Sequence, residues 1–113
     1  MSEQTPAQRS KIEEILAALR RGLYEIYAGR MKRLLLFGSY ARGEAQEGSD
    51  IDVAVVLDDF EDALAEVERA SDLVYRLCLQ RGCVIALLPV REREYQNGKF
   101  PIHMNLRREG IPI

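Results

Sequence analysis

The sequence has 113 residues, of which 47% are hydrophobic and 30% charged, and its formal net charge at pH 7 is −2. This length predicts one domain, residues 1–113, with a single core and no room for separate catalytic and substrate domains. Acidic and basic residues are mixed along the chain, which argues against a dedicated polyanion-binding surface, so direct nucleic-acid binding is not expected.

The sequence also lacks the signals of membrane insertion and export. No apolar run approaches the about 18 residues of a membrane span, and residues 1–11 lack the apolar core of a signal peptide. We therefore expect a cytoplasmic protein. Cys78 and Cys83 match neither a C-x-x-C motif nor zinc-ligand spacing, and they are interpreted as small buried apolar residues.

The first predicted element is a helix that begins at the cap Thr5-Pro6 and ends near Gly29. Apolar residues recur in it at helical spacing: Ile12, Ile15, Leu16, Leu19, Leu23 and Ile26. Two strands follow, at 32–37 and 51–57, and both are apolar enough to be largely buried.

A second helix is predicted from about residue 60 to 81, with Asp58-Asp59 as its cap and Gly82 as its end. Its expected core stripe consists of Leu64, Val67, Val74, Leu77 and Cys78. A third strand is predicted at 83–90, and Pro89 near its end indicates that the strand lies at the edge of the sheet or is leaving it.

Two helical segments are predicted in the C-terminal region, of which the first is exposed to solvent. Residues 91–94 are interpreted as a solvated helical turn, and a short helix should end at Gly110. His103 is the single histidine, and a surface or interface role is expected for it.

The segment between the first two strands carries the most specific pattern. Gly38-Ser39 is followed, after ten residues, by Asp50-Ile51-Asp52. Side chains alternate along a strand, so Asp50 and Asp52 should project from the same side, where their mutual repulsion favours a bound divalent cation. Gly38 allows a sharp turn close to a ligand, and Ser39 offers a hydroxyl and an N–H to phosphate. The pattern predicts a phosphate-and-metal site, and the alternative is solvated turn chemistry.

This pattern resembles the signature of the nucleotidyltransferase superfamily built on the DNA polymerase β palm, and within it the minimal nucleotidyltransferases. The resemblance implies an α/β (α+β) fold with a small mixed sheet, helices packed mainly on one face and the Asp pair on the other. It also implies that Asp50 and Asp52 are catalytic and bind the metal, while Gly38 and Ser39 contact the triphosphate.

Two further residues receive weaker roles from the resemblance. Ser49 would orient Asp50, and Arg42 would approach phosphate. Turn formation by Ser49 and a solvated charge at Arg42 are equally weighted alternatives.

The reaction implied by the resemblance is attack by a hydroxyl on the α-phosphorus of a nucleoside triphosphate, with release of pyrophosphate. ATP is the expected donor, Mg²⁺ or Mn²⁺ the expected metal, and a protein or small molecule the acceptor. The resemblance further implies a helical HEPN-domain protein as partner, with this chain as the antitoxin of the pair. Homo-oligomer formation is left open.

One departure from the family pattern bears on activity. The resemblance implies a third carboxylate, which active members usually carry on the strand after the second helix, where this chain has Ile85 or Ala86. Glu92 or Glu94 could substitute through a bend, although the solvated turn is the favoured interpretation. Two alternatives to an active enzyme therefore stay open: a degenerate module that acts on a partner by contact alone, and a nucleotide sensor without turnover.

Overall fold

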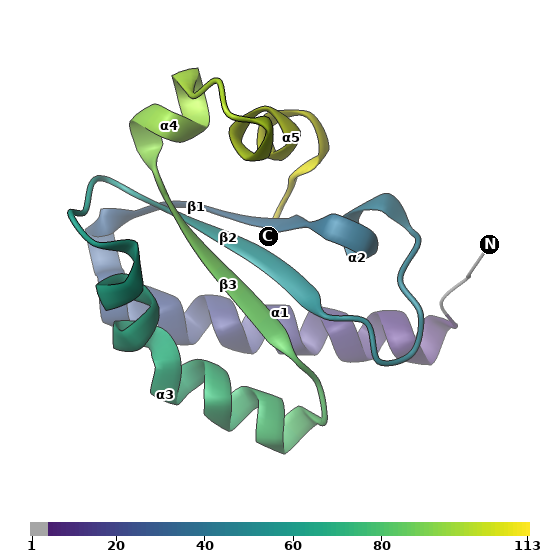
Figure 1. The fold of residues 1–113 in the computed structure, drawn as a ribbon. Helices are drawn as coiled ribbons and strands as arrows, with labels where there is room; N and C mark the ends of the chain where they lie inside the picture. Colours follow the sequence, from purple (N-terminus) through teal and green to yellow (C-terminus); the bar gives the residue numbers. More distant parts are fainter. Residues whose placement is uncertain (1–4) are drawn as a thin grey trace.

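A computed structural model of the chain describes residues 5–113, which form one mixed sheet and the helices around it (Figure 1). Residues 1–4, part of the segment tested above for a signal peptide, lie outside the described residues. In chain order the elements are α1 (Pro6–Tyr27), η1 (Ala28–Arg30), β1 (Met31–Phe37), α2 (Gly38–Arg42), β2 (Ile51–Leu57), α3 (Ala63–Arg81), β3 (Ile85–Arg91), α4 (Glu92–Asn97), α5 (Pro101–Glu109) and β4 (Ile111–Pro112).

The sheet has the strand order β3-β2-β1-β4. β2 and β3 are parallel, whereas β1 is antiparallel to both of its neighbours, β2 and β4. The predicted small mixed sheet is therefore confirmed. β3 lies at the edge that Pro89 predicted, because a residue without an N–H is tolerated where no strand follows.

The two long helices, α1 and α3, cover one face of the sheet, and the short helices α4 and α5 lie over the other (Figure 1). Successive side chains of β2 point to opposite faces of the sheet. Ile51 and Val53 pack in the core with α1 and α3. Ala54 and Val56 pack on the other face with Leu106 of α5. Burial on both faces explains why β2 is an almost uninterrupted apolar run. The expected placement of the helices mainly on one face is confirmed.

α1 begins as its sequence predicts. The Thr5 hydroxyl accepts a hydrogen bond from the Gln8 backbone N–H (3.2 Å), and the Gln8 side chain accepts one from the Thr5 N–H (2.8 Å), which satisfies two otherwise free donors. Ile15, Leu19 and Leu23 of the predicted stripe are fully buried.

The predicted start of the second helix was wrong. α3 begins at Ala63, and the Asp62 carboxylate caps it by accepting from the Leu64 N–H at 3.0 Å. Asp58 and Asp59 instead accept from the backbone N–H of the residue that follows each of them, and both form ion pairs with arginines. These acids order the connection from β2 to α3, so the helix starts later.

The predicted stripe of α3 was correct at Leu77 and wrong at Leu64, which is 63% exposed. The Tyr27 hydroxyl donates to the Glu66 carbonyl at 2.9 Å, so α1 meets the first turn of α3 on the side of Glu66. Glu66 lies about 200° around the helix from Leu64. Further along, Gly22 of α1 leaves room for Leu73, and Gly82 ends the helix in the left-handed conformation, as predicted.

The C-terminal region confirms the two predicted helical segments and adds a strand. α4 follows β3 directly, α5 ends before Gly110, and β4 pairs with Leu35 and Leu36 of β1, a pairing that the sequence did not predict. The expectation for His103 was wrong: it is buried, with its ring edge-on to Phe100. Within the described part of the chain, no helix is long and apolar enough to cross a membrane.

Candidate functional site

The Gly38-Ser39 pair stands where β1 ends and α2 begins. Gly38 has a positive φ of 72°, a conformation that side-chain-bearing residues rarely adopt, and a Cβ atom there would overlap the Asp52 carboxylate. The expected motif loop thus starts as a one-turn helix, closed by the Glu44 N–H, which donates to the Ser39 carbonyl at 2.9 Å. Glycine is required here both by the backbone conformation and by the close approach of Asp52.

The Asp pair lies at the start of β2. Asp52 is in register with Phe37 of β1 and Ala86 of β3, and its neighbours Ile51 and Val53 point toward α1 and α3. Asp52 therefore faces the opposite side of the sheet, as expected, and Asp50, two residues earlier, is exposed.

The electrostatics of the pair favour a positively charged ligand. Burial raises the pKa of Asp52, the charge of Asp50 raises it further, and Arg42 lowers it in part. Among residues 5–113, no hydrogen-bond donor or ion-pair partner contacts either carboxylate. Two neighbouring hard oxygen ligands without a partner fit Mg²⁺ or Mn²⁺, which would relieve their repulsion.

Arg42, at the end of α2, lies close enough to affect Asp52 but is held by other acids. Its Nε pairs with Glu44, and its Nη1 lies 3.8 Å from a carboxylate oxygen of Glu109 in α5. The sequence did not indicate Glu109 at this place, because only the packing of α5 over the sheet brings it there. The Arg42 side chain is about half exposed.

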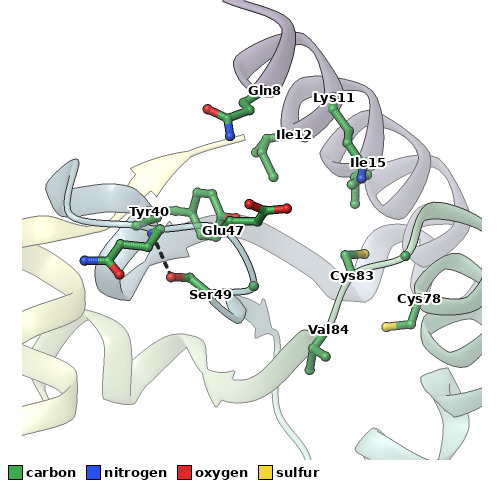
Figure 2. A pocket seen from close by; sticks show the side chains of 14 residues that line it. Gln8, Lys11, Ile12, Ile15, Tyr40, Glu47, Ser49, Cys78, Cys83 and Val84 are labelled. Atoms are coloured by element: carbon green, nitrogen blue, oxygen red, sulfur yellow. Dashed lines mark hydrogen bonds between the residues drawn. The ribbon is translucent and has the colours of Figure 1, made fainter. Parts of the chain in front are cut away.

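Ser49 is part of the turn before Asp50. Its hydroxyl accepts from the Gln46 N–H at 2.8 Å, and its own N–H donates to the Gln46 carbonyl at 3.0 Å. Figure 2 shows this bond among the residues that line a hollow. The hollow has a volume of about 640 Å³ and lies between α1, the 45–49 segment and the end of α3. The hollow is lined by Ile15 and Cys78 of the α1 and α3 layer, so it lies behind the Asp pair.

The position beside Asp52 on β3 is occupied by Ala86, whose side chain is exposed. Glu92 and Glu94 cannot substitute there, because Arg91, just before them, is in register with Leu57 at the far end of β2. Five residues of strand correspond to about 17 Å. No group of three acidic, histidine or cysteine side chains that could hold a metal occurs among the described residues.

Glu94 has a structural role at that distant end. Its carboxylate accepts from the backbone N–H and from the guanidinium of Arg91, both at 3.2 Å, and lies 3.8 Å from His103 Nε2. These contacts join α4 to β3 and α5. The solvated turn expected for residues 91–94 is a helical start, with Glu94 half-buried.

Comparison with known proteins gives consistent results. The nucleotidyltransferase domain family matches residues 10–104. A Methanocaldococcus jannaschii protein proposed to be a protein adenylyltransferase is 38% identical over 105 residues, covering 91% of this chain and 94% of that protein. The protein adenylyltransferase MntA of Thermococcus cleftensis is 34% identical over 95 residues, covering 75% of this chain and 92% of MntA.

A solved structure is similar in fold. It is a complex of a tri-AMPylated HEPN toxin from Shewanella oneidensis with an MNT antitoxin. The superposition has a TM-score of 0.54 at 18% identity and covers 92% of this chain and 69% of the other. At this identity the likeness concerns the fold alone.

Proposed function

The chain belongs to the nucleotidyltransferase domain family and, within it, to the minimal nucleotidyltransferases, and we propose that it transfers AMP from ATP to a hydroxyl group of a partner protein. The observation that carries this proposal is the contact between the turn at Gly38 and the carboxylate of Asp52. It brings the two halves of the sequence motif, separated by ten residues, to one place at the end of β1 and the start of β2.

Each half has a separate task in the proposal. The backbone turn at Gly38 and the hydroxyl and N–H of Ser39 contact the triphosphate, while Asp50 and Asp52 hold a divalent cation. When bound, such a cation polarises the α-phosphoryl group and neutralises charge on the leaving pyrophosphate. The acceptor oxygen forms a bond to the α-phosphorus, the bond to the pyrophosphate oxygen breaks, and the hydroxyl proton passes to water.

Ser49 and Arg42 have supporting roles in the proposal. We propose that Ser49 fixes the turn that aims Asp50, because its hydroxyl is already engaged by Gln46. Arg42 would exchange its contact with Glu44 for a phosphate oxygen, since its guanidinium is half exposed beside Asp52.

We further propose that the acceptor is a helical HEPN-domain protein and that the chain acts as the antitoxin of that pair. The names of its relatives support the protein acceptor, and the AMPylated toxin in the structurally similar complex supports the kind of partner.

A second candidate function rests on Ala86. Without a third carboxylate beside Asp52, the site would bind nucleotide and metal with slow transfer or none, and the chain would act by contact or as a nucleotide sensor.

Calorimetric titration of ATP, with and without Mg²⁺, tests the proposed site. We expect binding that requires Mg²⁺ and that weakens at least about tenfold in the double variant Asp50→Asn, Asp52→Asn. The variant Glu68→Gln, Asp72→Asn, which removes two exposed acids of α3, is the matched control and should bind as wild type does. Absence of binding by folded wild-type protein would contradict the nucleotide site.

Transfer itself is tested with ATP labelled at the α-phosphate and a co-purified partner. Label on a tyrosine, serine or threonine of the partner supports adenylyl transfer. Nucleotide binding without label on any partner residue would favour the degenerate site.

A further inference from the structure

Some basic side chains of the protein form ion pairs with carboxylates, and others do not. Carboxylates form ion pairs with many of the arginines: Arg30, Arg42, Arg69, Arg81, Arg91, Arg93 and Arg108. Arg20, Arg21, Lys32 and Arg33 are all exposed, and among residues 5–113 none of the four forms an ion pair with a carboxylate. The Arg33 guanidinium instead lies over the ring of Tyr95, 5.1 Å from its centroid, and Lys32 helps to lower the pKa of Asp58.

These four cations line one hollow of about 660 Å³ between α1, residues 31–35 of β1 and the C-terminal residues 112–113. A single acid, Glu25, is part of its lining. The remaining lining is largely apolar and includes Tyr24, which is 62% exposed. The apolar members are Tyr24, Met31, Leu34, Leu35, Pro112 and Ile113. The hollow thus combines concentrated positive charge with an apolar surface.

Protection of a sheet edge explains only part of this arrangement. β4 pairs with Leu35 and Leu36, so the outer edge of β1 at 31–33 has no partner strand among the described residues, and its register is irregular there. Exposed charges and an irregular register are common means of blocking unwanted strand pairing. They account for Lys32 and Arg33, but not for Arg20 and Arg21, which come from α1.

We propose that this hollow, which we call the basic hollow, docks an acidic segment of a partner protein that also carries apolar side chains. Cations without an ion pair attract carboxylates, and arginine beside exposed tyrosine is typical of protein interfaces. A nucleic acid fits less well, because its phosphates would not use the apolar lining and the net charge of −2 repels a polyanion at long range.

The basic hollow and the candidate site both lie along β1, and the hollow extends from the start of the strand. Met31 and Lys32 line the hollow, whereas Gly38 follows the last residue of the strand. The lining also includes Leu35, three residues before Gly38 and about 10 Å from it along the strand. Because α1 bounds the hollow and Asp52 faces the side of the sheet opposite α1, a partner docked there would leave the Asp pair open to nucleotide. The docking proposal therefore stands or fails independently of the transfer reaction.

Fluorescence anisotropy with a labelled short synthetic peptide of glutamate and leucine tests the proposal. We expect binding to the full chain that weakens about tenfold or more in the variant Arg20→Glu, Arg21→Glu and also weakens at high salt. The matched control Arg76→Glu reverses an exposed charge on α3 outside the hollow and should bind the peptide as wild type does. Circular dichroism checks that each variant is folded, and calorimetry checks that ATP binding is unchanged.

Three outcomes would overturn the proposal. Tighter binding of an oligouridylate than of the peptide would identify a nucleic-acid surface instead. Concentration-dependent self-association that disappears in the Arg20→Glu, Arg21→Glu variant would identify a second copy of the chain as the occupant. Equal peptide binding by that variant and by wild type, or no binding by either, would leave edge protection as the role of these cations.

Discussion

Asp52 shows how a candidate functional residue can oppose stability. Its carboxylate lies against Gly38 and near the charge of Asp50, and no described residue forms an ion pair with it. Burial and the neighbouring charge raise its pKa, so the folded protein holds this proton more tightly than the unfolded chain does. A raised carboxyl pKa means that ionisation of Asp52 costs stability as the pH rises above the ordinary value of 3.8.

The variant Asp52→Asn should therefore be more stable than wild type at pH 7, by about 0.5–1 kcal/mol. Below the ordinary pKa the carboxyl is protonated in both states, so the difference should vanish on acidification. Urea unfolding at several pH values measures it, with Asp72→Asn on exposed α3 as the control. A variant less stable than wild type at pH 7 would show that Asp52 has a favourable partner.

At the scale of one element, the start of α3 depends on which aspartate caps the helix. Three aspartates in the connection, Asp58, Asp59 and Asp62, are all good capping residues, and only Asp62 accepts from a backbone N–H of the helix. The other two are engaged by arginines from η1, β3 and α4. A local pattern cannot rank three equivalent caps, because long-range ion pairs decide between them.

We accordingly expect Asp62→Ala to lower the free energy of unfolding by about 1 kcal/mol through loss of the α3 cap. Glu61→Ala, at the preceding exposed position, should change it little and is the control. Chemical denaturation of both variants makes the comparison, and equal effects would contradict the capping role of Asp62.

At the scale of the whole molecule, the candidate site is assembled from three elements. α2 supplies Gly38 and Ser39, β2 supplies Asp52 and directly follows Asp50, and β3 supplies the position beside Asp52 that Ala86 occupies. Parallel pairing of β2 with β3 places Ala86 on the same side of the sheet as Asp52. A single substitution at Ala86 would therefore place a third carboxylate beside Asp52.

Ala86→Asp should raise the rate of AMP transfer, by about 100-fold if the new carboxylate accepts the acceptor's proton. Pyrophosphate release in the presence of ATP, Mg²⁺ and partner measures this rate. Ala86→Asn has the same shape without the charge and should not show the increase. A folded Ala86→Asp variant that is no faster than Ala86→Asn would mean that the third carboxylate is not what limits the wild type.

The sequence by itself determined the features that depend on neighbours in the chain. Helical spacing of apolar residues gave the buried face of α1, the apolar runs gave β1 and β2, and Gly82 marked the end of α3. The motif Gly38 to Asp52 was recognisable for the same reason, since its residues lie within one short segment. The resemblance it carried predicted the family that the comparison then showed.

The tertiary structure alone decided the features that depend on contacts between distant segments. The pairing of β4 with β1, the burial of His103 and the approach of Glu109 to Arg42 all follow from the packing of α5 across the sheet. The register of β3 removed Glu92 and Glu94 from the site. Such contacts join residues far apart in the chain, and periodicity, which reports only which face of an element is buried, carries no information about them.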